Sequence, residues 1–293
     1  MQQKVKIIEC PRDAMQGLSY FIPTDQKIEY LHKLLEVGFD TIDFGSFVSA
    51  KAIPQMADTH ELIQSIENLK SETKLLAIIA NQRGAEEAIL YKNIHCLGFP
   101  FSVSETFQLR NTNSSIEQST ERVKIISEIC QKHNKEFIVY LSMAFGNPYR
   151  DSWNAEIVAA YIERLKKYQC KQFALSDTIG IASPESIHYL FESIIPAFPD
   201  CEIGAHLHST PNTWLEKISA AVQAGCRKFD GAIRGYGGCP MAKDELTGNI
   251  PTEALINFFS TNDYETGVNK DAFFQAMELS EKIFVDNAHK SSR

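Results

Sequence analysis

Two histidines with one residue between them, His206 and His208, stand at the end of a stretch, Glu202 to His208, whose pattern is typical of a buried β-strand. Residues i and i+2 of a strand project from the same face, so both imidazoles point together. Two neutral imidazoles form a good partial metal site, and a carboxylate such as Asp13 would raise the affinity for a hard divalent ion. The alternative is a pair of structural histidines held by hydrogen bonds. Asp13, at the end of another strand of the same predicted barrel, favours the metal site.

Other polar side chains also stand where predicted strands end. Arg12 and Asp13 come directly after the first strand, with Gln16 a few residues on, and an exposed turn with a salt bridge is the alternative reading. Asp43 ends the second strand and Asp177 follows the sixth; either could cap a helix or brace a loop. Their joint placement at strand ends favours an active site.

A glycine-rich segment, Gly235 to Pro240, follows the last predicted strand and continues to Thr247-Gly248-Asn249. Glycines allow the backbone to approach a ligand closely. Cys239 is flanked by these glycines, so its thiol could donate or accept a proton; a passive cysteine in a flexible loop is the alternative. No strand and helix frame a Gly-x-Gly-x-x-Gly pattern here, which argues against a dinucleotide site.

Short apolar runs alternate with stretches of helical period, which is the pattern of repeated βα units with a parallel sheet. Eight units favour the α/β fold class and a closed TIM (β/α)8 barrel of one domain, residues 1–293, with the barrel at about 4–262 and extra C-terminal helices at about 268–290. The predicted strands are Val5 to Cys10, Thr41 to Phe44, Lys74 to Ala80, Ile94 to Gly98, Phe137 to Met143, Gln172 to Ser176, Glu202 to His208 and Lys228 to Ala232.

The predicted helices have recognisable ends. Thr24 and Ser183 are expected to cap helices, and Gly38 and Gly225 to end them. The eight helices are expected over Asp25 to Val37, Thr59 to Asn68, Arg83 to Tyr91, Ile116 to His133, Ala155 to Tyr168, Pro184 to Ile194, Thr213 to Ala224 and Thr252 to Phe259.

Composition limits the possible partners. The 29 basic and 37 acidic residues give a formal net charge of −8 without a basic block, so a nucleic acid partner is not expected. The apolar runs are far shorter than the roughly 20 residues of a membrane span. The N-terminus has no apolar signal core, and the seven cysteines form no CxxC pair, so the expected compartment is the cytoplasm and most thiols are expected to be buried.

At these residues the sequence resembles the HMG-CoA lyase family, within the superfamily of metal-dependent barrel lyases and Claisen synthases. The matching blocks cover most of the chain: Pro11 to Gln16, Ser46 to Lys51 with Pro54 to Met56, Asp177 to Gly180, His206 to His208, and Gly237 to Pro240 with Gly248-Asn249. Weaker similarity lies at Ser104 to Phe107 with Asn111 and at Gly146 to Tyr149.

The resemblance implies roles for individual residues. Asp13, His206, His208 and Asn249 correspond to the family's ligands for Mg²⁺ or Mn²⁺. Arg12 corresponds to its catalytic arginine, Cys239 to a loop cysteine that handles a proton, and Asp43 to a supporting glutamate. Coenzyme A needs polar and cationic partners, for which Lys51, Gln16 and Asn111 are candidates.

The implied reaction is a retro-Claisen cleavage of 3-hydroxy-3-methylglutaryl-CoA to acetyl-CoA and acetoacetate, with His206 or a metal-bound water taking the first proton. Departures from the family, such as Ser209 after the His-x-His motif and Ala14 in place of glycine, leave the acyl group open. A lyase or Claisen-type acyltransferase for another 3-hydroxy acyl-CoA or hydroxy acid, and a non-catalytic acyl-CoA-binding barrel, are the alternatives. A homodimer is expected because such barrels often associate.

Overall fold

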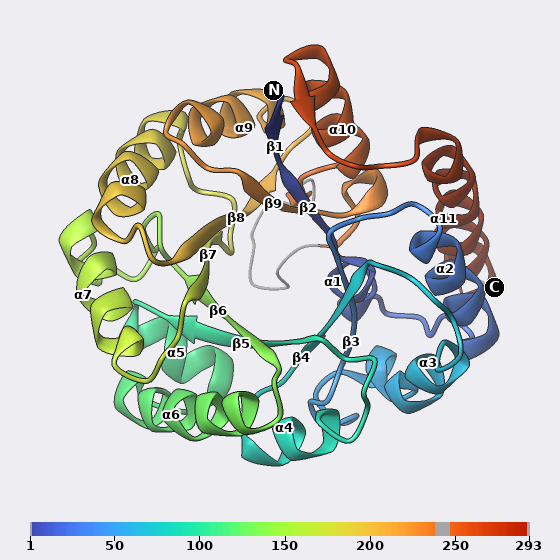
Figure 1. Cartoon of the computed structure of the whole chain (residues 1–293), viewed down its shortest axis with the longest axis horizontal. Helices are drawn as coiled ribbons and strands as arrows, with labels where there is room; N and C mark the ends of the chain where they lie inside the picture. Colours follow the sequence, from blue (N-terminus) through green and yellow to red (C-terminus); the bar gives the residue numbers. More distant parts are fainter. Residues whose placement is uncertain (1, 238–246, 292–293) are drawn as a thin grey trace.

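The computed structural model describes residues 2–237 and 247–291, and eight of its strands form a closed parallel barrel (Figure 1). Each strand pairs with the next along the chain, and the last pairs back with the first. All eight predicted strands and the TIM-barrel class are confirmed. The strands are β2 Lys6–Glu9, β3 Thr41–Ser46, β4 Lys74–Ile78, β5 Cys96–Ser102, β6 Glu136–Ser142, β7 Gln172–Asp177, β8 Glu202–Ser209 and β9 Lys228–Gly231.

Eight of the helices are those predicted, with ends shifted by up to three residues, and they surround the barrel (Figure 1). Ser183 caps its helix as expected, but Thr24 does not: it lies inside the first turn and its hydroxyl donates to Asp58. The helices are α2 Thr24–Leu35, α3 Thr59–Ser65, α4 Gln82–Ala88, α6 Ile116–Lys132, α7 Ala155–Lys166, α8 Pro184–Ala197, α9 Trp214–Gln223 and α10 Thr252–Thr261.

The sequence prediction missed several short elements. They are α1 Pro11–Gln16, α5 Glu105–Thr112, two 3₁₀ turns, η1 Pro54–Met56 and η2 Ile233–Gly235, a small sheet of β1 Gln3–Lys4 with β11 Tyr264–Glu265, and β10 Gly248–Asn249. The C-terminal extension is one helix, α11 Lys270–Ser291, where the prediction allowed two.

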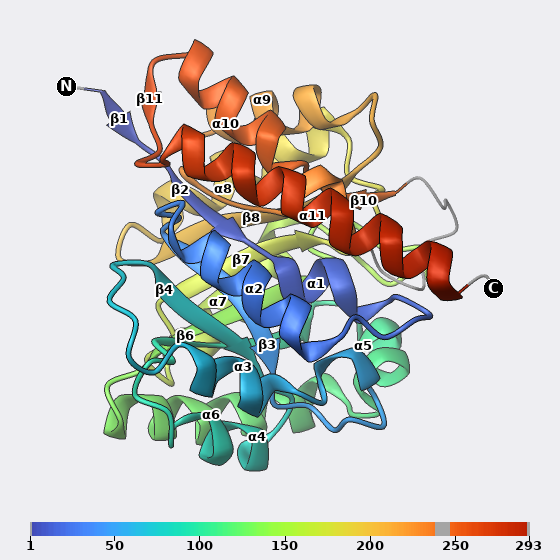
Figure 2. The same ribbon diagram turned by 90° about the vertical axis from the view of Figure 1, so that its right-hand side faces the viewer.

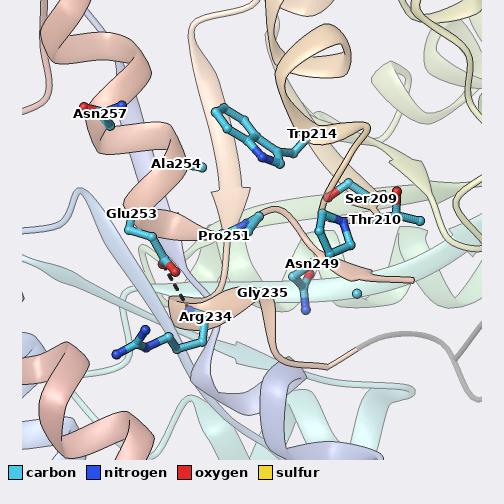
Figure 3. A pocket seen from close by; sticks show the side chains of 12 residues that line it. Ser209, Thr210, Trp214, Arg234, Gly235, Asn249, Pro251, Glu253, Ala254 and Asn257 are labelled. Carbon is cyan, nitrogen blue, oxygen red and sulfur yellow. Dashed lines mark hydrogen bonds between the residues drawn. The ribbon is translucent and has the colours of Figure 1, made fainter. Parts of the chain in front are cut away.

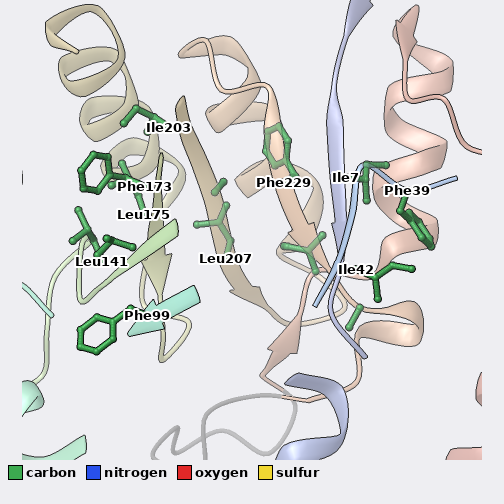
Figure 4. Close-up of a cluster of buried hydrophobic side chains, with 14 of the residues drawn as sticks. Ile7, Phe39, Ile42, Phe99, Leu141, Phe173, Leu175, Ile203, Leu207 and Phe229 are labelled. Carbon is green, nitrogen blue, oxygen red and sulfur yellow. The ribbon is translucent and has the colours of Figure 1, made fainter. Parts of the chain in front are cut away.

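The strands alternate between two environments, as the period of two requires. Outward-facing residues such as Leu141 of β6 and Leu207 of β8 pack in the main core between strands and helices (Figure 4). Inward-facing residues of the same strands, such as Tyr140 and His206, lie inside the barrel, where their rings meet edge to face at 5.7 Å. His206 and His208 therefore share the barrel interior, as predicted.

Charged and polar side chains close the N-terminal end of the barrel. Lys228 Nζ contacts Glu202 at 2.7 Å and Gln172 at 2.9 Å, and Gln172 Nε2 donates to Glu136 at 2.7 Å. Ion pairs from Lys6 to Glu202 and from Lys74 to Glu136 extend the network. Because this network fills the N-terminal end of the barrel, the active site is expected at the C-terminal end, where the βα loops of such barrels carry function.

Helix α11 packs along α2 and reaches the barrel mouth (Figure 2). Its Phe284 ring stacks on Tyr236 with centroids 4.3 Å apart, and Glu281 pairs with Arg234 at 2.6 Å. The last helix is thus attached to the segment that follows β9. Within the described ranges, no helix is long and apolar enough to cross a membrane.

Candidate metal centre and active site

Three side chains meet inside the C-terminal mouth of the barrel. Asp13 of α1 and His206 and His208 of β8 place one ligand atom each within 4.8 Å of one another. Asp13 belongs to a helix, where the sequence pattern indicated only a loop, because Pro11 occupies the first helical position and starts the helix directly after β2. The predicted approach of these three residues is confirmed.

The two imidazoles have different surroundings. His206 Nδ1 contacts Asp230 Oδ2 at 3.0 Å, and Nε2 has no hydrogen bond to a described residue. Both ring nitrogens of His208 are buried, and neither has a hydrogen-bond partner among the described residues. A buried polar group without a partner is costly, and a metal ion would supply the missing contact. A carboxylate that orients a ligating histidine is the usual second partner in such sites. The residues therefore fit a divalent cation.

Arg12 joins two carboxylates behind this cluster. Its NH1 donates to Asp13 Oδ1 at 2.9 Å and to Gln16 at 2.7 Å, while Nε donates to Asp43 Oδ2 at 3.0 Å. NH2 donates to Asp43 as well. A guanidinium has five N–H donors, so one N–H of NH2 has no bond to a described residue and can serve a ligand. The reading of Arg12 and Asp13 as an exposed turn is wrong, since Arg12 is 7% and Asp13 6% exposed.

The carboxylates on either side of Arg12 differ in acidity. Burial would raise the pKa of Asp13, but the charges of Arg12 and the two imidazoles lower this pKa to about 2. Burial dominates at Asp43, and the charges of Asp13 and Asp230 add to it, so its pKa rises to about 6 although Arg12 pulls it down. Asp13 is thus held as an anion, as a metal ligand must be.

The two imidazoles also differ in pKa. Burial, followed by the charge of His206, lowers the pKa of His208 to about 4, which keeps this ring neutral near pH 7. Burial would lower the pKa of His206 as well, but this pKa is raised by the hydrogen bond and charge of Asp230 and by the charge of Asp13.

Strand β10 brings Asn249 to the cluster. It pairs antiparallel with the end of β8, so that Asn249 stands opposite His208. Asn249 Nδ2 donates to Asp13 Oδ2 at 2.8 Å and to Tyr236 O at 2.9 Å, and its Oδ1 has no bond from a described residue. Gly237, at φ +90°, allows the approach, because a Cβ there would lie 2.7 Å from Asp13 O and 2.8 Å from Asn249 Nδ2.

The remaining predicted residues have varied surroundings. Gln16 Nε2 donates to Asp13 at 2.7 Å, so this side chain orients the Arg12 and Asp13 pair. Lys51, in the loop after β3, and Asn111, in the last turn of α5, are both exposed. Cys239 lies outside the described residues. Asp177 braces its loop, as one of the two readings held: its oxygens accept from Ile181 N at 2.9 Å and Ala182 N at 3.0 Å.

Four buried polar residues near the C-terminal ends of the strands were missed. Asp230 supports His206, Lys217 contacts Asp177, Glu9 accepts from Ile233 N, and the Tyr140 hydroxyl has no partner among the described residues. A usable signal existed for Asp230 and Glu9, which are carboxylates at inner or terminal positions of apolar strands. Lys217 lies in a helix that reads as amphipathic, so nothing in the sequence points to it.

A cavity of about 510 Å³ adjoins Asn249 (Figure 3). Trp214 and Thr210 line one wall, and Glu253 and Asn257 of α10 line another. Ser209, which directly follows the His-x-His motif, also lines it. Its volume is in the range of small-molecule sites.

Comparisons with known proteins agree with this geometry. The HMGL-like family model matches residues 4–279. A hydroxymethylglutaryl-CoA lyase of Bacillus subtilis is 34% identical over 281 residues, which is 96% of this chain and 93% of that protein. A crystal structure of the Bacillus subtilis HMG-CoA lyase has a TM-score of 0.89 at 32% identity, covering 96% of this chain and 93% of that one.

An HMG-CoA lyase of Acinetobacter baumannii, solved with coenzyme A and 3-methylmalate, has a TM-score of 0.87 at 30% identity and covers 96% of this chain and 91% of that one. The family match over nearly the whole barrel and the identity over most of each relative's length lead to one conclusion. These relatives are lyases, and the chain belongs to the HMGL-like family.

Proposed function

We propose that the protein is a divalent-metal-dependent carbon–carbon lyase that cleaves 3-hydroxy-3-methylglutaryl-CoA to acetyl-CoA and acetoacetate. The observation that carries this proposal is the cluster of Asp13, His206 and His208 next to Arg12 in the mouth of the barrel, in which His208 has no hydrogen-bond partner among the described residues. The names of the full-length relatives support the substrate.

Asp13, His206, His208 and Asn249 would hold the metal, which we propose to be Mg²⁺ or Mn²⁺ because oxygen ligands make up half of the set. His206 would bind the metal through Nε2, since Nδ1 contacts Asp230, so ligation would leave this ring no nitrogen for use as a base. When bound, the ion supplies positive charge that lowers the pKa of the substrate's tertiary hydroxyl.

Cleavage breaks the C2–C3 bond of the substrate. The hydroxyl loses its proton to a water molecule in the mouth of the barrel and becomes the ketone of acetoacetate, while the electron pair of the broken bond passes to C2 and forms the thioester enolate. Arg12 stabilises the enolate oxygen, because its charge is fixed by Asp43 and Asp13 and one N–H of NH2 is available. Burial opposes the charge on Arg12, but Asp43 and Asp13 raise its pKa, so it stays a cation.

The enolate carbon then takes up a proton to give acetyl-CoA. We assign this step to the Cys239 thiol, in the segment that joins Gly237 to Gly248. The anchored ends of that segment, next to Asp13 and Asn249, support the assignment.

Coenzyme A is proposed as the carrier because a relative of the same fold was solved with it. The cavity next to Asn249 offers room for part of this carrier. Exposed Lys51 stays the candidate partner of a phosphate, and Asn111 a candidate polar contact. The homodimer and the cytoplasmic compartment stay predictions.

The test is an assay of the purified protein with 3-hydroxy-3-methylglutaryl-CoA and Mn²⁺ or Mg²⁺, following acetoacetate with and without chelator. We expect chelator-sensitive release. Absence of release, with one metal bound per chain, would refute this substrate. It would favour the second candidate, a lyase for another 3-hydroxy acyl-CoA, because Ser209, an expected departure from the family, lines the cavity.

A further inference from the structure

Lys217 is a buried cation in an unfavourable place. It lies in the first turn of α9, where the helix dipole disfavours positive charge, and its side chain is only 4% exposed. Lysine is rarely buried this deeply unless it is paired. Its contacts must therefore offset the cost of its position.

Those contacts connect two neighbouring strand ends. Lys217 Nζ donates to His208 O at 2.7 Å, to Asp177 Oδ2 at 2.9 Å and to Gly180 O at 3.2 Å. His208 belongs to β8, whereas Asp177 and Gly180 begin the connection from β7 to α8. A single ammonium group thus holds the end of β8 against this connection.

Both anchored segments also support β10. His208 is the register partner of Asn249, and Gly180 lies against Thr247, which directly precedes β10. The contact between Gly180 and Thr247 is close, because a Cβ on Gly180 would lie 2.5 Å from the Thr247 methyl group. A shift of either segment would therefore displace β10 as well as His208.

We propose that Lys217 is a positioning residue for the metal site: by locking the end of β8 to the β7–α8 connection, it holds His208 and Asn249 in place for the cation. This inference rests on the proposed function, because it takes the cluster to be a metal site. Among the described residues, Lys217 makes no hydrogen bond to a side chain of the cluster; it acts through the carbonyl of His208 and through β10.

The test is the Mn²⁺ affinity of the full chain, measured by calorimetry with Mn²⁺ alone, for the wild type and for Lys217→Met. Methionine keeps the apolar length of the side chain and removes all three hydrogen bonds. We expect the Kd for Mn²⁺ to rise about 10- to 100-fold, the usual effect of losing a group that orients a metal ligand.

Lys228→Met is the matched control. Lys228 is also a buried barrel cation, bridging Glu202 and Gln172, but at the opposite end of the barrel. We expect this variant to lose thermal stability and to keep the wild-type Kd. An equal rise in Kd for both variants would mean general destabilisation and would overturn the proposal.

A second variant, Asp177→Asn with Lys217→Met, removes both charges and so avoids an unpaired buried carboxylate. We expect its Mn²⁺ binding to stay weakened, because the His208 carbonyl still lacks its donor. Wild-type affinity in either folded Lys217 variant would overturn the positioning role and leave the proposed function standing. A wild-type protein that binds no Mn²⁺ would refute the proposed function first, and this inference with it.

Discussion

Arg12 contacts two carboxylates that differ in pKa. Asp13 has a pKa near 2 and belongs to the cluster with the imidazoles, whereas Asp43 has a pKa near 6 and accepts from Arg12. One guanidinium therefore has two tasks: it keeps Asp13 anionic, and it directs a fixed charge at the mouth.

Replacing Arg12 by methionine tests the second task. We expect Arg12→Met to lower kcat about 100- to 1000-fold, the usual effect of removing one preorganised charged donor. Metal stoichiometry should stay at one, since Asp13, His206, His208 and Asn249 all remain. Turnover with 3-hydroxy-3-methylglutaryl-CoA and Mn²⁺ titration are the measurements. Arg83→Met, at an exposed arginine of α4, is the control, and near-normal turnover in Arg12→Met would contradict the enolate role.

The sequence could predict that Asp13, His206 and His208 come together, because their positions follow from simple rules. The two-residue strand period places His206 with His208, and the barrel rule places Asp13 near both. The partners of these residues could not be predicted in this way. Asp230 and Lys217 reach them from other elements, so their roles depend on how β9 and α9 pack.

At the scale of elements, β2 holds both ends of the β9–α10 connection through one side chain. Glu9 Oε1 accepts from Ile233 N at 2.9 Å, and Oε2 accepts from Thr252 Oγ1 at 2.6 Å. Burial is the main cause that raises the pKa of Glu9 to about 8, against the two hydrogen bonds that lower it. The carboxyl group is therefore mostly protonated in the folded protein at neutral pH.

This shift predicts a pH dependence of stability. The folded-state pKa near 8 lies above the ordinary value of 4.5, so the folded chain keeps a proton that the unfolded chain releases. The contribution of Glu9 is complete below about pH 4.5, is lost as the pH rises to 8, and changes no further above that. Each pKa unit corresponds to about 1.4 kcal/mol, which gives a change of a few kcal/mol.

Glu9→Gln removes this titration while its amide still reaches Ile233 N and Thr252. Urea unfolding of both proteins from pH 5 to pH 8.5 should show wild-type stability falling relative to the variant as the pH rises. Other groups titrate in both proteins, so the difference isolates Glu9. Parallel stability curves across this range would show that Glu9 is ionised in the folded state.

The elements themselves could be predicted when they were long and regular. The eight strands and eight surrounding helices follow from the hydrophobic period alone. The six-residue helix α1 and the two-residue strand β10 could not be predicted, because neither shows a period. The pairing of β10 with β8 is tertiary, and it is this pairing that delivers Asn249.

At the scale of the whole molecule, the candidate ligands come from distant parts of the chain. Asp13 follows the first barrel strand, His206 and His208 belong to the seventh, and Asn249 follows the eighth. The barrel closes where β2 meets β9 and β9 meets β8, so the ligands span this closure. An ion bound there would join the first and last units of the fold.

Such an ion must stabilise the folded chain as a whole, because the unfolded chain cannot bring these ligands together. At a free Mn²⁺ concentration of 100 times Kd, we expect the free energy of unfolding to increase by about 2.7 kcal/mol, measured as a rise in Tm with added Mn²⁺. His208→Ala should abolish the rise and keep a folded protein without metal, since it removes a buried ring that has no hydrogen-bond partner among the described residues. A local site on β8 alone would bind Mn²⁺ in the unfolded chain as well, and would raise the Tm little even in the wild type. If the Tm of His208→Ala still rises strongly with Mn²⁺, the ion binds elsewhere. If the Tm rises strongly in the wild type and not in His208→Ala, the site requires the closed barrel.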